Sequence, residues 1–309
     1  SRERAEQPVC SAAMYQTVPL CVGNRVPART QASYTGAQAL SMPMPAGSTA
    51  VWNPGVSVPA HHSYAGNTFR QQAPAPAPAP ASAVLKVQLC PVALHETAEA
   101  GTFVIASGRR QAYVFVPRLA ESGYAMPLLL VLHGRRPQQV SEEENEEYAG
   151  RYRQVADQAE AIVLMPLSAD DTWDFLINEG TTRLDLDFIS HALNEVRRTW
   201  IVDDARIAIL GLSDGASYGL SLAVNNHDVF QAAFLWACGF VFPTPPPRLL
   251  SGSRGRPKIL WWHGTQDQVF NFEKLALPLQ ASLVRAGYDV TFLPEEGGRH
   301  RAPEPPSLF

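Results

Sequence analysis

Short, unbroken runs of apolar residues recur along the chain after about residue 84, and they restrict the folds that it can adopt. An apolar run without polar alternation is typical of a β-strand that is buried on both faces, as in a parallel sheet. Such strands are predicted at residues 84–92, 126–132, 161–166, 206–212, 232–237, 259–262 and 290–293. A hairpin is predicted around Ser107-Gly108-Arg109-Arg110, with strands at 102–106 and 112–117.

Helical patterns separate the apolar runs, at residues 142–158, 184–196, 214–224 and 272–286. The first opens on glutamates and the second ends on Arg197 and Arg198, which suits the partial charges at the two ends of a helix. Alternating strands and helices predict an α/β fold, in which a mostly parallel sheet carries helices on both faces. Ligands of such folds bind at the carboxyl ends of the strands, so functional residues are expected there.

The N-terminal part of the chain has a different composition. Residues 1–83 show no apolar period of a strand or a helix, and residues 73–81 alternate alanine and proline. No acidic residue lies between Glu6 and Glu96. We therefore expect two units: an irregular Ala/Pro-rich extension and linker over 1–83, and the α/β domain over 84–309. The extension is expected to lie away from the domain and to bind an acidic surface of a protein assembly.

Composition argues against several classes of protein. The net charge of −4 gives no global basic field for a nucleic-acid backbone. No apolar run approaches the roughly 18 residues that a membrane-spanning helix needs. The cysteines form no CxxC pair, so neither a zinc site nor another metal site is expected. Four unpaired cysteines and the lack of a signal peptide favour an intracellular protein. The acid-poor leader is weakly similar to an organelle transit peptide. The cysteines are Cys10, Cys21, Cys90 and Cys238.

The sharpest motif is Gly211-Leu212-Ser213-Asp214-Gly215. It follows a predicted strand and opens a predicted helix, which is the context of a nucleophile elbow. The tight turn needs small neighbours on both sides of the serine, and the helix N-terminus favours negative charge that develops nearby. We therefore predict that Ser213 is a catalytic nucleophile.

A serine nucleophile needs a histidine base, and the base needs an orienting carboxylate. Asp267 follows the predicted strand at 259–262, and His300 follows the strand at 290–293. The order serine, acid, histidine is that of α/β-hydrolases, and all three residues are expected at one edge of the sheet. The catalytic residues are therefore predicted to be Ser213, Asp267 and His300.

Other histidines and acids fit these roles less well. His133 and His263 end strands but precede Asp267 in the chain. The side chain of Asp214 is expected to leave the elbow in another direction. The remaining alternatives are a mid-helix histidine, two histidines of the extension, and two acids at the opposite end of a strand, namely His191, His61, His62, Asp203 and Asp204.

Acyl transfer also needs hydrogen-bond donors for the oxyanion of the tetrahedral intermediate. The backbone N–H of Asp214, directly after the nucleophile, is one predicted donor. The second is expected in the loop after the strand at 126–132, which begins His133-Gly134-Arg135. Because glycine lets this backbone turn inward, the N–H of Arg135 is predicted to be the second donor.

Several short motifs occur together in a recognisable order. They are Leu132-His133-Gly134, Trp173-Asp174-Phe175, Val202-Asp203-Asp204-Ala205-Arg206-Ile207, Gly211-Leu212-Ser213-Asp214-Gly215-Ala216-Ser217, His263-Gly264-Thr265-Gln266-Asp267 and Gly297-Gly298-Arg299-His300. The stretch from about Ala112 to Pro303 thereby resembles the phospholipase/carboxylesterase family of α/β-hydrolases, near the feruloyl-esterase and polyhydroxybutyrate-depolymerase-like esterases. The resemblance implies an α/β-hydrolase that cleaves carboxylic or thio-esters without metal or cofactor. It also implies the same triad and the same two oxyanion donors.

One departure from the family pattern bears on function. Arg299 is inserted between the glycines and His300, where relatives read Gly-Gly-His. We expect the turn at Gly297-Gly298 to absorb the insertion, so that His300 still reaches Ser213. Two functions remain open: a serine esterase, or a hydrolase-fold subunit or scaffold that is anchored by its extension and has little catalysis.

Overall fold

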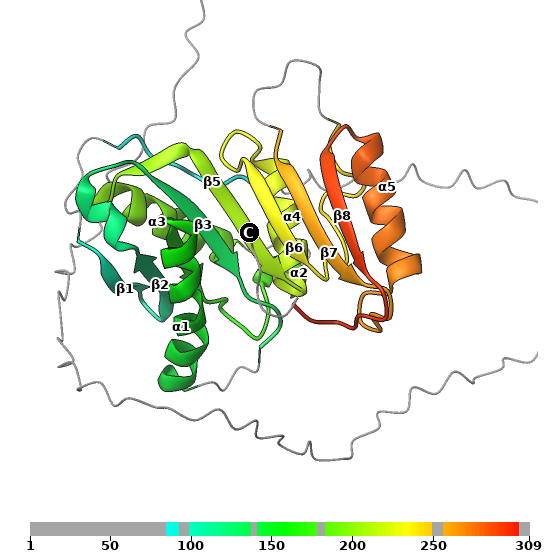
Figure 1. The fold of residues 1–309 in the computed structure, drawn as a ribbon, viewed down its shortest axis with the longest axis horizontal. Helices are drawn as coiled ribbons and strands as arrows, with labels where there is room; N and C mark the ends of the chain where they lie inside the picture. The colour runs from blue at the N-terminus through cyan, green and yellow to red at the C-terminus, as the bar shows by residue number, and fades with distance from the viewer. Residues whose placement is uncertain (1–84, 93–98, 137–140, 178–182, 249–255, 303–309) are drawn as a thin grey trace, which may run out of the picture. The chain divides into compact units, whose positions relative to one another are not determined.

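An eight-stranded sheet forms the centre of the protein, seen in a computed structural model that describes residues 85–92, 99–136, 141–177, 183–248 and 256–302 (Figure 1). The strand order is β1-β2-β4-β3-β5-β6-β7-β8. Only β2 runs antiparallel to its neighbours, and every other pairing is parallel. The strands are β1 (Gly101–Ser107), β2 (Arg110–Val116), β3 (Met126–Leu132), β4 (Ile162–Pro166), β5 (Val202–Leu212), β6 (Ala232–Trp236), β7 (Lys258–Gly264) and β8 (Asp289–Glu295).

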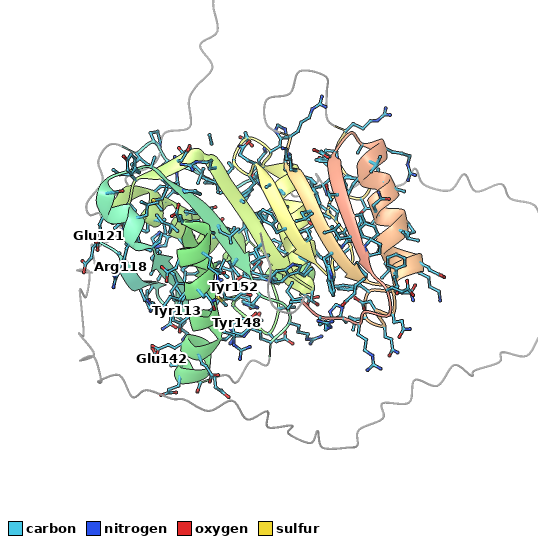
Figure 2. The ribbon with its side chains drawn as sticks, in the orientation of Figure 1. Tyr113, Arg118, Glu121, Glu142, Tyr148 and Tyr152 are labelled. Atoms are coloured by element: carbon cyan, nitrogen blue, oxygen red, sulfur yellow. The ribbon has the colours of Figure 1, made fainter. Side chains whose placement is uncertain are left out.

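Helices pack on the two faces of this sheet. Alternate residues of β3 join different apolar clusters: Leu130 lies with α3, α4 and α5, and Val131 lies with α1. On the α1 face, Tyr148 and Tyr152 pack against the cluster that contains Tyr113 of β2 (Figure 2). The helices are η1 (Arg118–Ser122), α1 (Glu142–Ala159), α2 (Asp174–Ile177), α3 (Leu184–Thr199), α4 (Asp214–Asn225), η2 (Phe272–Ala276) and α5 (Leu277–Arg285). This arrangement is the α/β-hydrolase fold, as predicted.

Local signals fix where α1 begins. Ser141 accepts a hydrogen bond from the backbone N–H of Glu144, and the Glu144 carboxylate accepts one from the N–H of Ser141. This capping box satisfies two N–H groups that a helix start otherwise leaves without acceptors. The glutamates of the first turn therefore do more than face solvent, because one of them closes the helix end.

The strand predicted at 84–92 is wrong for the residues described. Leu85–Val92 are extended but belong to no strand. Their backbone donates to side chains and not to a neighbouring strand. The Val87 N–H donates to Oδ1 of Asn226, directly after α4, and the Cys90 N–H donates to Oδ1 of Asn194 in α3, each at 2.8 Å. The apolar residues of this segment reflect burial of Leu85 and Val87 in the core beside these helices.

Two predicted boundaries also shift. The helix expected over 272–286 is a π-helical turn, η2, followed by α5, because Pro278 sits in the first turn of α5 and has no N–H to donate backwards. β5 begins at Val202, so Asp203 and Asp204 belong to its start, where they pair with Arg206 and Arg197. Residues 1–84 lie outside the described residues, so the expected extension over 1–83 stays a prediction.

Candidate active site

Ser213 occupies the turn between β5 and α4 in an unusual backbone conformation. Its φ is 56° and its ψ is −120°, a region that residues with a side chain rarely adopt and that costs about 1–3 kcal/mol. Hydrogen bonds hold it there: the Ser213 N–H donates to Trp236 O at 2.9 Å, and Ser213 O accepts from Ala216 N at 3.0 Å. The sheet and the helix thus impose the turn and leave the serine partly exposed.

The two glycines of the elbow are required by close backbone contacts. A Cβ on Gly211 would lie 2.4 Å from the Gly215 carbonyl oxygen, within the helix start. A Cβ on Gly215 would lie 2.2 Å from the Leu132 carbonyl oxygen, at the end of β3. Both distances are far below contact, so the prediction that small neighbours are required is confirmed.

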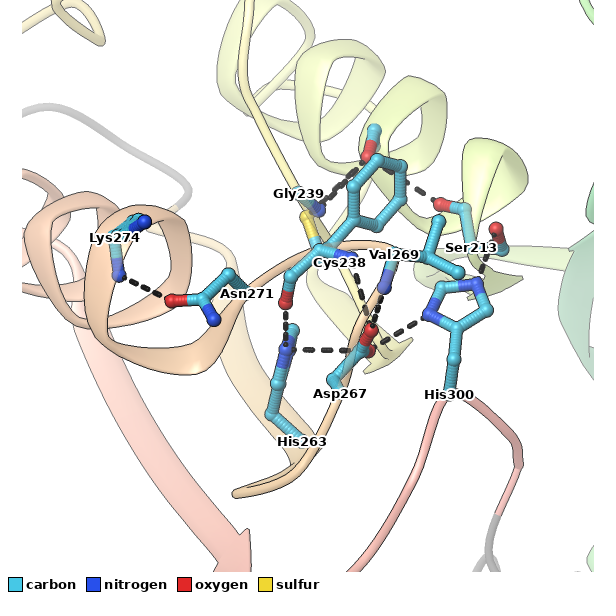
Figure 3. A network of polar contacts seen from close by, with 11 residues as sticks. Ser213, Cys238, Gly239, His263, Asp267, Val269, Asn271, Lys274 and His300 are labelled. Atoms are coloured by element: carbon cyan, nitrogen blue, oxygen red, sulfur yellow. Dashed lines mark hydrogen bonds and ion pairs between the residues drawn. The ribbon is translucent and has the colours of Figure 1, made fainter. Parts of the chain in front are cut away.

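Ser213, His300 and Asp267 form a hydrogen-bonded chain (Figure 3). His300 Nε2 lies 2.8 Å from Ser213 Oγ, and His300 Nδ1 lies 2.7 Å from Asp267 Oδ2. The carboxylate of Asp267 is fully buried, and the imidazole of His300 is 20% exposed. In this geometry Nδ1–H donates to the carboxylate, and Nε2 is free to accept the serine proton.

Asp267 is oriented by its own loop. Its Oδ1 accepts hydrogen bonds from the backbone N–H groups of Val269 and Phe270, both at 2.8 Å. These bonds leave Oδ2 for His300, so the rotation of the carboxylate is fixed before the imidazole meets it.

The insertion of Arg299 does not displace the histidine. Gly297 has a φ of 71°, which glycine adopts freely, and the Gly298 N–H closes the turn onto Glu295 O at 3.0 Å. The turn docks against the loop after β7, since Gln266 N donates to Gly298 O at 2.8 Å. His300 therefore lies within hydrogen-bond distance of Ser213, and the geometric prediction is confirmed.

The two backbone groups predicted to bind the oxyanion belong to the start of α4 and to the loop after β3, whose Gly134 lies beside the serine. The N–H of Asp214 is the first of α4 and has no acceptor within the helix. Gly134 lies so close to the elbow that a Cβ on it would be 3.2 Å from Ser213 Cβ. The Arg135 side chain pairs with Asp171 and is 71% exposed. Their part in catalysis remains a prediction.

Two histidines beside the site have roles that the sequence did not reveal. His133, at the end of β3, and His263, in β7, are both buried. Burial lowers the pKa of His133 to about 4 and lowers that of His263. Each is followed by glycine at the carboxyl edge of the sheet, a signal that could have found them. His191 is exposed on α3, whereas His61 and His62 lie outside the described residues.

The described part of the chain contains no metal cluster, no membrane-spanning helix and no disulfide. There, no group of three or more His, Cys, Asp or Glu side chains could hold a metal ion. No helix among the same residues is long and apolar enough to cross a membrane. The cysteines in that part, Cys90 and Cys238, are not joined in a disulfide.

Similarity to known proteins is limited to parts of the chain. No family model matches the chain. A curated acetylxylan esterase from Coprinopsis cinerea is 28% identical over 158 residues, which are 40% of this chain and 42% of that protein. The chain thus matches about two fifths of the length of this relative.

The chain also has distant similarity to solved structures. A thermostable esterase has a TM-score of 0.45 at 21% identity, covering 64% of this chain and 54% of its own. An S-formylglutathione hydrolase from Agrobacterium tumefaciens has a TM-score of 0.45 at 18% identity, covering 65% of this chain and 88% of its own. A ferulic acid esterase has a TM-score of 0.46 at 16% identity, covering 66% and 91%.

Proposed function

We propose that the protein hydrolyses carboxylic esters, or thio-esters, with Ser213 as nucleophile, His300 as base and Asp267 as orienting acid. The observation that carries the proposal is the chain of two hydrogen bonds, 2.8 and 2.7 Å long, from Ser213 through His300 to Asp267. The strained serine at a strand-to-helix turn is independent support, because such strain clusters at functional sites.

The geometry supplies each step of acyl transfer. As Ser213 Oγ attacks the ester carbonyl, its proton passes to His300 Nε2, and the C=O electron pair moves to oxygen. His300 then returns the proton to the leaving alcohol or thiol, and an acyl-serine remains. Water, deprotonated by the same nitrogen, attacks the acyl carbon and releases the acid with free Ser213. Each of these steps uses residues of the chain alone.

The buried carboxylate of Asp267 stabilises the imidazolium that forms in each half of the reaction. It also keeps the proton of neutral His300 on Nδ1, so that the base nitrogen faces the serine. The backbone N–H groups of Asp214 and Arg135 are proposed to bind the oxyanion, whose charge develops beside the N-terminus of α4.

For the acyl group we propose a short chain such as acetyl. The name of the C. cinerea relative, an acetylxylan esterase, supports this choice. Ser213 is partly exposed, so a bulky alcohol group can remain in solvent while a small acyl group sits at the elbow.

The test is hydrolysis of p-nitrophenyl acetate by the full chain and by its Ser213→Ala variant. The unaltered protein is expected to turn over, and the variant to lose activity by roughly a thousandfold or more, since only oxyanion stabilisation would remain. Equal rates for the two proteins at equal folded concentration would contradict the proposal.

The alternative of a scaffold without catalysis has less support. It rested on a displaced His300, which the described geometry contradicts, and on the extension over 1–83, which lies outside the described residues. Accordingly, no second function is proposed.

A further inference from the structure

The loop between β4 and α2, residues 167–173, contacts both sides of the proposed oxyanion site. From this loop the Ser168 N–H donates to His133 Nε2 at 3.0 Å, and the Trp173 Nε1–H donates to His133 O at 3.0 Å. The backbone of Asp171 accepts from Arg136 N at 2.7 Å. The loop therefore touches the strand end that carries one proposed oxyanion donor.

The same loop reaches the other proposed donor through Thr172. Its hydroxyl donates to the Asp214 carboxylate at 2.7 Å, so the side chain of Asp214 is turned away from Ser213 and towards the loop. Asp214 thus contributes its backbone to the serine side and its carboxylate to the loop, as the sequence predicted for the direction of this side chain.

The loop is itself fixed from below by Asp185, at the start of α3. Asp185 Oδ1 accepts from Ala169 N at 3.0 Å, and Oδ2 accepts from Asp174 N at 2.6 Å. Arg110 pairs with the same carboxylate, which is fully buried. A loop tied down at both of its ends can act as a rigid support.

His133 is the part of this support that bears on the Arg135 N–H. Its Nδ1 lies 2.7 Å from Gly134 O, and its Nε2 accepts from Ser168 N, so the neutral ring carries its proton on Nδ1. The ring stacks on Trp173, with centroids 4.7 Å apart, which prevents it from rotating away. Burial lowers the pKa of His133 to about 4, so the ring is neutral at pH 7.

Peptide geometry converts this contact into control of the oxyanion donor. Gly134 C=O and Arg135 N–H belong to one planar trans peptide, so they point in opposite directions. When His133 holds the carbonyl, the N–H must point away from the imidazole. The following peptide is held as well, because Arg136 N donates to Asp171 O. Both peptides that flank Arg135 are therefore fixed.

We infer that His133 is a positioning residue for the esterase reaction: its Nδ1–H sets the Gly134–Arg135 peptide so that the Arg135 N–H is aimed at the oxyanion. This inference rests on the proposed function. His133 is not a second base, because both of its nitrogens are engaged with backbone groups. Trp173 and Thr172 of the 167–173 loop assist, since they fix His133 and Asp214 relative to one another.

The test compares His133→Asn with His133→Gln. The amide nitrogen of asparagine comes close to the position of Nδ1, whereas that of glutamine comes close to the position of Nε2. If the Nδ1–H is what matters, the Asn variant keeps kcat for p-nitrophenyl acetate within about fivefold, and the Gln variant loses about a hundredfold, as expected for loss of one oxyanion donor. KM is expected to change less than twofold in both.

A boronic acid that forms a tetrahedral adduct with serine gives a second readout. Its affinity is expected to fall in the Gln variant in parallel with kcat, while thermal stability falls equally in the two variants. Equal kcat in the Asn and Gln variants, or a loss that follows stability alone, would overturn the inference.

Nitrogen NMR of His133 separates this inference from the proposed function. The expected spectrum is that of an Nδ1-protonated neutral ring that does not titrate between about pH 5 and 8. That spectrum in an inactive protein would support the assigned tautomer and contradict the esterase proposal. An active protein whose His133 is protonated on Nε2 would overturn the positioning role alone.

Discussion

His133 and His263 have similar surroundings in the sheet, but they form different hydrogen bonds. Each lies at the carboxyl end of a parallel strand, His133 directly after β3 and His263 in β7. Each is followed by glycine and is buried with a lowered pKa. His133 uses both nitrogens on backbone groups near the proposed oxyanion site. His263 contacts Phe270 and Asp267, in the loop that carries the acid.

His263 uses only one nitrogen. Its Nε2 lies 2.7 Å from Phe270 O and 3.4 Å from Asp267 Oδ2. An Nε2–H therefore donates to the carbonyl of Phe270 and lies close to the carboxylate of Asp267. Its Nδ1 is buried with no hydrogen-bond partner among the described residues. A His-Gly dipeptide thus has two uses. In β7, His263 contacts the loop of Asp267 through Nε2, and after β3, His133 contacts the backbone of Gly134 through Nδ1. The loop packed above each strand decides which nitrogen is used.

The sharpest contrast is with His300, which alone of these histidines contacts Ser213. Replacing His300 with alanine is expected to lower kcat by about ten-thousandfold, since it removes the proposed base. Steady-state hydrolysis of p-nitrophenyl acetate measures this, with circular dichroism to verify folding. If the loss were no greater than that of a His133 or His263 variant, the contrast would fail.

The pH dependence of the unfolding free energy tests whether burial keeps His133 neutral. Because the pKa of His133 is about 4 when folded and 6.5 when unfolded, its contribution to stability is complete above about pH 6.5 and is lost as the pH falls towards 4. The shift corresponds to about 3 kcal/mol of unfolding free energy. Urea unfolding at pH 7 and 4.5 should therefore show a smaller acid loss in His133→Asn than in the unaltered protein. Identical losses would mean that His133 is not held neutral.

The smallest expected effect on kcat is at His263, where the tolerated substitution is the reverse of that at His133. At His263 glutamine should preserve activity, because its amide nitrogen comes close to Nε2 and can still donate to Phe270 O. His263→Asn is expected to lower kcat by about tenfold through misplacement of the Asp267 loop. Kinetics of the two variants check this, and the preference is the reverse of that at His133. The same preference at both positions would show that the two supports do not differ as described.

Much of this site follows from the sequence because its signals are local. The elbow needs Gly211 and Gly215 beside Ser213, and strand ends bring Asp267 and His300 to the same edge. The support by His133 depends on contacts with Ser168 and Trp173, distant in the chain, which no local pattern encodes.

The fold shows the same division between local and distant causes. Strand and helix alternation predicts the mostly parallel α/β sheet, but Leu85–Val92 is also predicted to be a strand, because the sequence indicates its burial and not its hydrogen-bond partners. Its hydrogen-bond partners, Asn194 and Asn226, are side chains of α3 and of the residue after α4. Likewise Pro278, in the first turn of α5, is a local signal for the start of that helix, whereas the π-helical turn before it has no such signal.

The central claim is that Ser213 is a nucleophile activated by His300. Labelling of the full chain with a fluorophosphonate probe, followed by peptide mapping, tests it most directly, because the probe reacts with activated serines regardless of the natural ester. The account predicts one adduct, on Ser213, and no labelling of the Ser213→Ala or His300→Ala variants. An unlabelled folded protein, or equal labelling of the His300→Ala variant, would contradict it.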